Sequence, residues 1–493
     1  MSYQQLKNAF SHYYRLHNIH ALLSWDREVH MPQGAYDQRG KQLATLTALM
    51  QTHLRDQAPR VNALDTSTMD AVDRANIREM QRLCHQATAI DPGLDQARET
   101  AINRCLQHWY QAREAGDFNI VTQSLQQVID LTQTYAQCLA QSPKDSSSCY
   151  EALAQSFQPG FSLTQTQTLF SHLQTPLTTY RQQHLNKSPK KSLLSPKISA
   201  DHSMPLMQTI AGHMGYDFNR GLIAQSAHPF CSGMHHDVRI TIKRQSTDLL
   251  SNIMALIHET GHALYEQGLS YTWLDQPVGQ TAGMAVHESQ SLFWEHQLAR
   301  HPSSLEFLSR TIHQNVSTHY PNFTVSAAML NQHLDTVTDT PIRVEADRRS
   351  YLLHIIHRFH IEQAMLEPGF KARDLPDLWQ HYSQVLLDHV SNDPRQGCLQ
   401  DVHWYAGLFG YFPCYGLGDI LAAQLYHHCL QAIGPQEEAF SKGDFSAPRR
   451  WLNSHIHQKA SQLSFQDLIV SACGEPLDSR YYLNTLTTPF EFI

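Results

Sequence analysis

Hydrophobic positions recur along most of the chain with the spacing of amphipathic helices. They lie in long mixtures of polar and apolar residues, for example at Leu22, Leu23, Ala44, Leu46, Leu49 and Met50. The stretch from Ile120 to Leu139 continues the pattern. Turn-forming residues interrupt it at Pro92, at Pro159 with Gly160, and at Pro176, where helices are expected to end or bend. The pattern predicts an all-α, predominantly helical protein.

Two segments depart from helical spacing. Val238 to Ile242 alternates in the manner of a short strand. Asn186 to Ser199 is rich in Lys, Ser and Pro and is expected to form an exposed loop. No internal repeat or low-complexity tract divides the rest. We therefore expect residues 1–493 to form a single large helical domain, with a small strand element beside the functional centre.

Composition narrows the class of protein. Of the 493 residues, 41% are hydrophobic and 17% charged, which is enough apolar material to fold around a core without disulfides. The net charge is −8 and the basic residues are scattered, so a nucleic-acid surface is not expected. No run of about 18 apolar residues occurs, so we also expect no membrane span.

The cysteines and the N-terminal segment indicate the cellular compartment. Nine cysteines lie at irregular spacings without a C-x-x-C pair, which is typical of free thiols in a reducing compartment. The segment from Met1 to Leu16 is polar and lacks the basic start and apolar block of a signal peptide. These features predict a cytoplasmic protein.

A metal-binding pattern, H-E-x-x-H, occurs at His258 to His262. On a helix, residues four apart share a face, so both imidazoles can reach one zinc ion. Glu259 lies about 100° round the helix, where it can take a proton from a water at the metal. Such nitrogen and oxygen ligands also accept Co²⁺ or Mn²⁺. The alternative for this pattern alone is a pair of buried histidines in a core helix.

A catalytic zinc site needs a third protein ligand and one open position. A second helical stretch, Thr281 to Arg300, carries Glu288 on the same face as Met284 and Leu292. A carboxylate on a partly apolar face needs a compensating charge, which a metal ion supplies. His287 is the competing ligand, although it points about 100° away from that row.

Five further motifs follow one another in a fixed order. They are His228 to Phe230, Asp237 to Thr241, His287 to Gln290, Ile342 to Asp347 and Gly397 to Trp404. These motifs resemble the signatures H-P-F, D-x-R-x-T, H-E-S-Q, I-R-x-x-A-D and G-x-x-Q-D-x-H-W of the carboxypeptidase Taq family of metal-dependent carboxypeptidases. Segments near both ends, Leu23 to Asp26 and Gly474 to Leu477, also resemble the family, so the similarity covers nearly the whole chain.

The resemblance implies a fold and an activity. The implied fold is a helical body whose halves flank a central cleft, and other helical zinc peptidases share this fold. Members of the family are usually homodimers. The family's third zinc ligand corresponds to Glu288, beside His258 and His262. The implied reaction releases single C-terminal amino acids from peptides with a free C-terminus, with Glu259 as general base and then acid. The alternatives are a helical zinc oligopeptidase that cleaves internal bonds of short peptides, and a catalytically idle scaffold.

Arginines within the motifs are candidates to bind the substrate carboxylate, because a guanidinium forms two parallel bonds to it. They are Arg239 and Arg343. The alternatives are a surface strand position for Arg239 and a helical salt bridge from Arg343 to Asp347, four residues on. His228 is expected in the wall of a substrate subsite.

Further candidates surround the metal. His403, Tyr411 and Tyr415 lie in a glycine-rich aromatic stretch and are candidates to stabilise an oxyanion, the alternative being aromatic packing between helices. Asp347 and Asp401 are candidates to orient a ligand imidazole from outside the ligand set, or else are ordinary ion-pair partners. Four positions depart from the family pattern, namely Arg348, Tyr405, Cys414 and Asp419. These departures bear on substrate preference and rate, since the metal ligands and Glu259 are unchanged.

Overall fold

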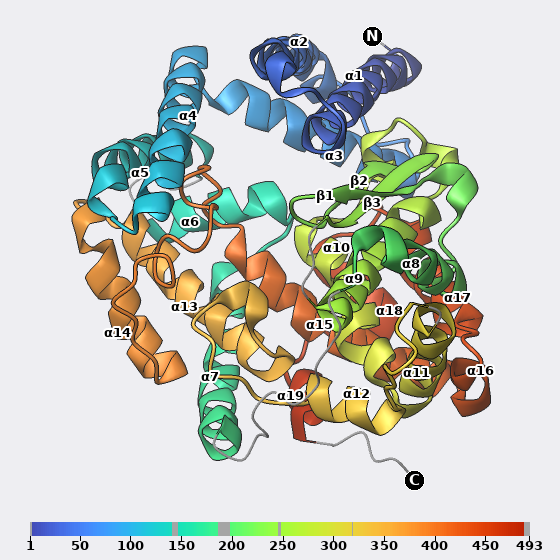
Figure 1. Cartoon of the computed structure of the whole chain (residues 1–493). Helices are drawn as coiled ribbons and strands as arrows, with labels where there is room; N and C mark the ends of the chain where they lie inside the picture. Colours follow the sequence, from blue (N-terminus) through green and yellow to red (C-terminus); the bar gives the residue numbers. More distant parts are fainter. Residues whose placement is uncertain (1, 141–145, 186–197, 245–247, 318, 488–493) are drawn as a thin grey trace.

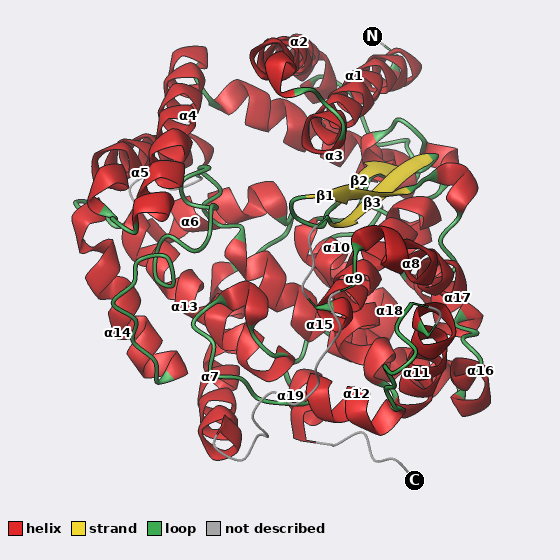
Figure 2. Ribbon diagram, viewed as in Figure 1, coloured by secondary structure: helices red, strands yellow, loops and turns green. Residues whose placement is uncertain are grey.

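Helices dominate the structure, as predicted. The computed structural model describes residues 2–140, 146–185, 198–244, 248–317 and 319–487, and in these ranges helices surround one small sheet (Figure 2). The loop expected at Asn186 to Ser199 lies, except for its last two residues, outside the described ranges. Among the described helices none combines the length and apolar character that a membrane crossing requires.

The first three helices form a layer of their own, at the top of Figure 1. They are α1 (Tyr3–Val29), α2 (Tyr36–Asn62) and α3 (Ala71–Ala89). Their facing apolar side chains enclose a small core that includes Leu6, Phe10, Leu54, Ile77 and Met80. This core is distinct from the main one, which begins with the next helix.

Five helices lead from this layer to the sheet. They are α4 (Pro92–Ala115), α5 (Asn119–Leu139), α6 (Ser146–Phe157), α7 (Leu163–Leu185) and α8 (Ala200–Met214). The carboxylate of Asp91 accepts the first free amides of α4, and Pro92 takes the first helical position, where its missing N–H costs nothing. Pro176, by contrast, lies inside α7, so it does not mark a helix boundary.

A three-stranded sheet lies between the α1–α3 layer and the main body. Its strands are β1 (Ile223–Ser226), β2 (Cys231–Met234) and β3 (Asp237–Lys243). The order is β1-β3-β2, with β1 parallel and β2 antiparallel to β3. The strand predicted at Val238 to Ile242 is confirmed, and Val238, Ile240 and Ile242 are buried. The sheet packs against α9 (Leu249–Gly268) through β3 and against α1 through β2.

Three α-helices follow α9, and the first of them carries Glu288. They are α10 (Met284–Leu292), α11 (Pro302–Val316) and α12 (Ala327–Leu334). The helical stretch predicted from Thr281 to Arg300 begins at Met284 and does not keep one form. It changes to a π-helical turn at Phe293–Gln297 and then to a 3-10 turn at Leu298–Arg300.

Seven further α-helices lie between Arg348 and Thr487, the last residue that the structure describes. They are α13 (Arg348–Leu366), α14 (Leu375–Leu387), α15 (Phe412–Ile433), α16 (Glu437–Ser441), α17 (Ser446–His455), α18 (Phe465–Cys473) and α19 (Arg480–Thr487). Helix α15 is buried along most of its length and packs against α10, near the centre of Figure 1. The main core extends from α4 to α19 and surrounds the α9, α10 and α15 group.

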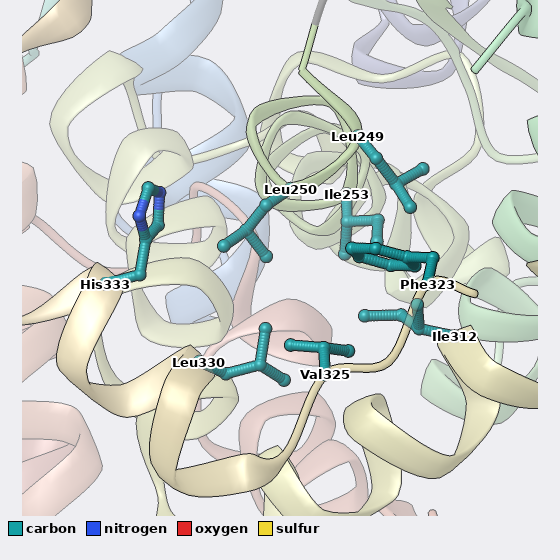
Figure 3. A pocket seen from close by; sticks show the side chains of 8 residues that line it. All are labelled: Leu249, Leu250, Ile253, Ile312, Phe323, Val325, Leu330 and His333. Atoms are coloured by element: carbon teal, nitrogen blue, oxygen red, sulfur yellow. The ribbon is translucent and has the colours of Figure 1, made fainter. Parts of the chain in front are cut away.

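Figure 3 shows an apolar pocket between the start of α9 and helices α11 and α12. Its walls include Leu250, Ile253, Ile312 and Leu330, with His333 at one side. The cavity volume is only about 10 Å³, which is at the lower limit for a single water molecule. This pocket is therefore a packing feature of the core and holds no substrate.

Candidate metal centre

The H-E-x-x-H pattern lies in the middle of α9. The carboxylate of Asp248 caps the helix by accepting from the amide of Leu250, and the helix ends at Gly268. The helix is buried on most sides, yet the side chains of His258 and His262 remain 22% and 13% exposed. Both imidazoles therefore emerge together on a partly exposed face of α9.

Glu288 of α10 meets these imidazoles. Its Oε2 lies 3.8 Å from Nε2 of His258 and 3.4 Å from Nε2 of His262. One ligand atom from each of the three residues lies within 4.8 Å of the others. Two imidazole nitrogens and one carboxylate oxygen converging on a point form a donor set that suits a catalytic zinc ion.

Two glycines make this convergence possible because helices can approach closely only where a Cβ is missing. A Cβ on Gly261, within the H-E-x-x-H motif, would lie 2.7 Å from the Gln290 carbonyl oxygen and 2.7 Å from Cα of Ser291. A Cβ on Gly418 of α15 would lie 2.7 Å from Cβ of Glu288. Helix α10 is thus held between α9 and α15, and Glu288 is fixed at the contact.

His258 is oriented by Glu295, which the sequence analysis did not identify. Nδ1 of His258 donates to Oε2 of Glu295 at 2.8 Å. This contact keeps the proton on Nδ1 and leaves the Nε2 lone pair for a metal. Glu295 lies seven residues after Glu288, which is close to two helical turns. The same-face spacing was therefore a signal available in the sequence.

His262 is oriented by the neighbouring motif. Nδ1 of His262 donates to the backbone carbonyl of His287 at 3.0 Å. It also lies 2.7 Å from the side-chain Nδ1 of His287. Nε2 of His287 in turn donates to Oε1 of Glu266 at 3.0 Å. His287 therefore lies behind His262, outside the group that converges with Glu288, and Glu266 completes a hydrogen-bonded chain.

The charges around the cluster fit a metal ion. Glu259 and Glu288 are only 9% and 7% exposed, and Glu295 adds a third carboxylate next to His258. Burial raises the pKa of Glu259 to about 7, with Glu288 adding to the effect. Several carboxylates beside two imidazoles in a poorly hydrated site need a compensating cation. The donor set and its charge are therefore suited to a divalent metal.

A family model described as carboxypeptidase Taq (M32) metallopeptidase matches residues 5–490. The chain belongs to this family. The resemblance seen in the motifs is thus confirmed, and the protein is a metallocarboxypeptidase, a hydrolase of peptide bonds.

Relatives of this M32 enzyme match it over nearly its full length. Thermostable carboxypeptidase 1 of Thermus thermophilus is 30% identical over 484 residues, covering 95% of this chain and 94% of that protein. The structure of metallocarboxypeptidase 1 of Trypanosoma cruzi superposes with a TM-score of 0.91 at 29% identity, covering 98% of each chain. A Pyrococcus furiosus carboxypeptidase gives 0.92 at 26% identity, covering 99% of each chain.

Arg343 of this M32 enzyme lies in a buried ion-pair network. Its Nε and Nη2 donate to Oδ1 of Asp401 at 3.0 and 2.9 Å, and Arg358 donates to Oδ2 of the same carboxylate at 2.7 Å. The two guanidinium groups hold the pKa of Asp401 well below its usual range, despite burial. The alternative salt bridge from Arg343 to Asp347 is therefore wrong, because Asp401 takes that guanidinium.

Arg239 is engaged elsewhere. Both ends of its guanidinium fork donate to Asp237, at 2.7 and 2.8 Å, and the group lies 4.5 Å from the ring centre of Trp25 on α1. Arg239 therefore fastens β3 to the α1–α3 layer. His228 follows β1 on an exposed turn, and its backbone carbonyl accepts from Ser226.

The three aromatic candidates lie together at the start of α15. Nε2 of His403 lies 3.1 Å from the Tyr415 hydroxyl, and the rings of Tyr411 and Tyr415 are 5.2 Å apart. Burial raises the pKa of both phenols, and the charge of Glu288 adds to the effect. Both hydroxyls thus remain protonated donors near the ligand cluster.

Asp347 and Asp401 do not orient a ligand imidazole. Asp347 caps α13 by accepting from the amides of Arg349 and Ser350, and Asp401 binds two arginines, as described above. The positions behind His258 and His262 are occupied by Glu295 and the His287 carbonyl. We expected Asp347 and Asp401 to orient the imidazoles. Residues of α10 and of the π-helical turn after it orient them instead.

Proposed function

We propose that this M32 enzyme uses zinc to release single C-terminal amino acids from peptides. His258, His262 and Glu288 would hold one ion per subunit, and Co²⁺ or Mn²⁺ would be accepted in its place. The observation that carries the proposal is the convergence of these three side chains, with both imidazoles oriented through Nδ1. A bound zinc ion supplies a Lewis acid that activates water and polarises the scissile carbonyl.

Glu259 is proposed as the proton carrier. It follows the first ligand on α9, so its carboxylate approaches the same opening from a different angle. As general base it would take a proton from the attacking water, and it would then return that proton to the leaving amine nitrogen. Its buried setting supports this role, since a carboxylate in poor contact with water holds a transferred proton more readily.

Substrate binding is proposed to involve the network around Arg343. Asp401 occupies Nε and Nη2 of that guanidinium, so Nη1 would meet the C-terminal carboxylate through a charge-assisted bond. The hydroxyls of Tyr411 and Tyr415 would donate to the oxyanion, with His403 positioning Tyr415. His228 would line a more distant subsite. The engaged position of Arg239 supports a positioning role for it rather than direct contact with substrate.

Assembly and location are also proposals. We infer a homodimer from the family resemblance, with a central cleft between helical halves receiving the peptide. Nine free cysteines, most of them buried, favour a reducing compartment, and we therefore propose the cytoplasm.

Product analysis tests the proposed reaction. A mixed set of unmodified peptides is incubated with zinc-loaded protein, and the products are identified by mass spectrometry over time. A carboxypeptidase shortens each peptide by one residue at a time from its C-terminus and releases free amino acids. Internal fragments without single-residue products would instead identify an oligopeptidase, and intact peptides would identify an idle scaffold.

A further inference from the structure

A second pocket lies behind the metal-binding helix. Its volume is about 200 Å³, and its lining includes Arg220, Gln267, Arg449, Arg450, Asn453 and His457. Gln267 is nine residues after His258, which corresponds to about half a turn of difference round α9. The pocket is therefore on the face of α9 opposite to the ligand cluster, and it is separate from the site already described.

The pocket is strongly basic. Three guanidinium groups contribute to the lining, and no carboxylate does. Arg220 is paired, with its Nε 2.8 Å from Oδ2 of Asp217. Among the residues that the structure describes, neither Arg449 nor Arg450 has a carboxylate within ion-pair distance. Asp444 lies near both arginines, which add to the Ser446 amide in lowering the pKa of its carboxyl. The pocket still keeps a net positive charge, with three guanidinium groups against the carboxylates of Asp217 and Asp444.

Helix ends explain only part of this charge. Helices α8 and α9 both end at the pocket, and cations are favourable at C-termini. Arg220 donates to the carbonyl of Gln267 at 2.9 Å, and Arg449 lies against Gly215, which caps α8 and would clash with it if it carried a Cβ. Arg450 lies in the first half of α17, where a cation is unfavourable.

We propose that this pocket binds a small anion of the phosphate class. Guanidinium groups present planar pairs of N–H donors that match phosphate oxygens. Arg449 and Arg450 would supply the charge, while Arg220, already oriented by Asp217, would supply a fixed donor. The volume accommodates a phosphate group together with part of a molecule that carries it.

An occupied pocket would be linked to the helices that carry the metal ligands. His457, at the inner wall, lies 3.0 Å through Nε2 from Oε1 of Gln290 on α10. The amide of Asn453 donates to the carbonyl of Gly268, the last residue of α9, at 3.0 Å. An anion that bridges Arg220 to α17 would therefore hold α17 against the ends of α9 and α10, and would stabilise the folded protein by mass action.

Calorimetric titration with inorganic phosphate at constant ionic strength tests the proposal. Phosphate should bind both zinc-loaded and metal-free protein, and should raise the melting temperature of each. The double variant Arg449→Gln/Arg450→Gln should bind about ten- to a hundred-fold more weakly, given the strength of charge-assisted bonds, and its peptidase activity without phosphate should be unchanged. The control Arg395→Gln removes an exposed arginine that pairs with Asp393 and should bind normally.

The same titrations define the contrary result. Phosphate could bind at the metal instead, in which case binding would disappear with the metal and persist in the double variant. Either that outcome or the absence of measurable binding to the unmodified protein at millimolar phosphate would overturn the proposal. Neither outcome would affect the assignment of the metal ligands, because the two sites lie on opposite faces of α9.

Discussion

Glu259 is adjacent to the proposed metal ligand His258 along the chain but is not part of the converging set. Glu259→Gln keeps the shape of the side chain and removes its ability to accept a proton. We expect the variant to retain its zinc and to lose about 10²- to 10⁴-fold in turnover. Elemental analysis and peptide hydrolysis on the same sample measure the two properties. Near-normal turnover would remove Glu259 from the mechanism.

Glu295 acts through His258 rather than on the metal itself. Glu295→Gln weakens the acceptor that keeps the proton of His258 on Nδ1, so we expect zinc affinity to fall about 10- to 100-fold. Competition with a chelator measures this affinity without reference to activity. Glu288→Ala, which removes a proposed ligand, should release zinc more completely, and His287→Ala should resemble the Glu295 variant. A larger zinc loss in His287→Ala than in Glu288→Ala would contradict the ligand assignment.

Glu362 is a buried carboxyl group away from the ligand cluster. It is fully buried and bonded to the Tyr150 hydroxyl and the Trp404 indole at 2.9 and 3.1 Å. Burial raises its pKa from 4.5 to about 8. The folded protein therefore binds a proton that the unfolded chain releases between these pH values, so stability must fall as pH rises through that window.

Glu362→Gln removes this titration and offers a test. The free energy of unfolding of the unmodified protein should fall, relative to that of the variant, by about 1.4 kcal/mol per pH unit between pH 5 and 8. Urea unfolding of both proteins at several pH values measures the difference. A difference that does not change with pH would show that Glu362 is ionised in the folded protein.

At the scale of elements, the contact between α9 and α10 determines whether His258, His262 and Glu288 converge. Gly261→Ala places a Cβ against the backbone of α10, so α10 must move and carry Glu288 with it. We expect the free energy of unfolding to fall by about 1–3 kcal/mol and zinc affinity to fall as well.

The matched control is Gly40→Ala, at an exposed position of α2 with open space around the new Cβ. It should leave zinc affinity unchanged and raise stability by up to about 1 kcal/mol. Equal behaviour of the two alanine variants would show that the close approach at Gly261 has no role in forming the site.

Local pattern was sufficient for some elements and insufficient for others. The strand at β3 followed from the alternation of Val238 to Ile242. The π-helical turn at Phe293–Gln297 did not, since a change in backbone hydrogen bonding leaves the hydrophobic spacing almost intact. Pro176 was expected to end or bend a helix, yet it lies inside α7. The surrounding tertiary contacts outweigh the local tendency of proline to interrupt a helix.

At the scale of the whole molecule, the contacts that sequence reasoning missed join distant segments. Asp401 binds Arg343 and Arg358, 58 and 43 positions away along the chain. Trp25 of α1 meets Arg239 of β3. Motif spacing brought His258 and His262 together because they share one helical turn, and the structure places Glu288 beside them. The partners of Arg343 depend on how α13, α15 and the segment before α15 pack, which periodicity does not encode.

The same network gives the decisive test of exopeptidase activity. Peptides with an amidated C-terminus should be cleaved about ten- to a hundred-fold more slowly than the same peptides with a free carboxylate. An amide carries no charge, so a charge-assisted contact of about 1.5–3 kcal/mol is lost in the transition state. Matched pairs of peptides, compared by kcat/KM, measure this discrimination.

Two variants assign the discrimination to a residue. Arg343→Lys replaces a planar guanidinium by an ammonium group, so it should lose much of the preference for the free carboxylate while retaining zinc. Arg239→Lys is the control, because Asp237 and Trp25 already engage that side chain, and it should keep the preference. If only Arg239→Lys lost the preference for the free carboxylate, the arginine that binds the substrate carboxylate would be Arg239 on β3. Equal cleavage of free and amidated peptides by the unmodified enzyme would leave the metal chemistry intact and would favour cleavage of internal bonds, because an enzyme that ignores the terminal charge has no means of measuring one residue from the end.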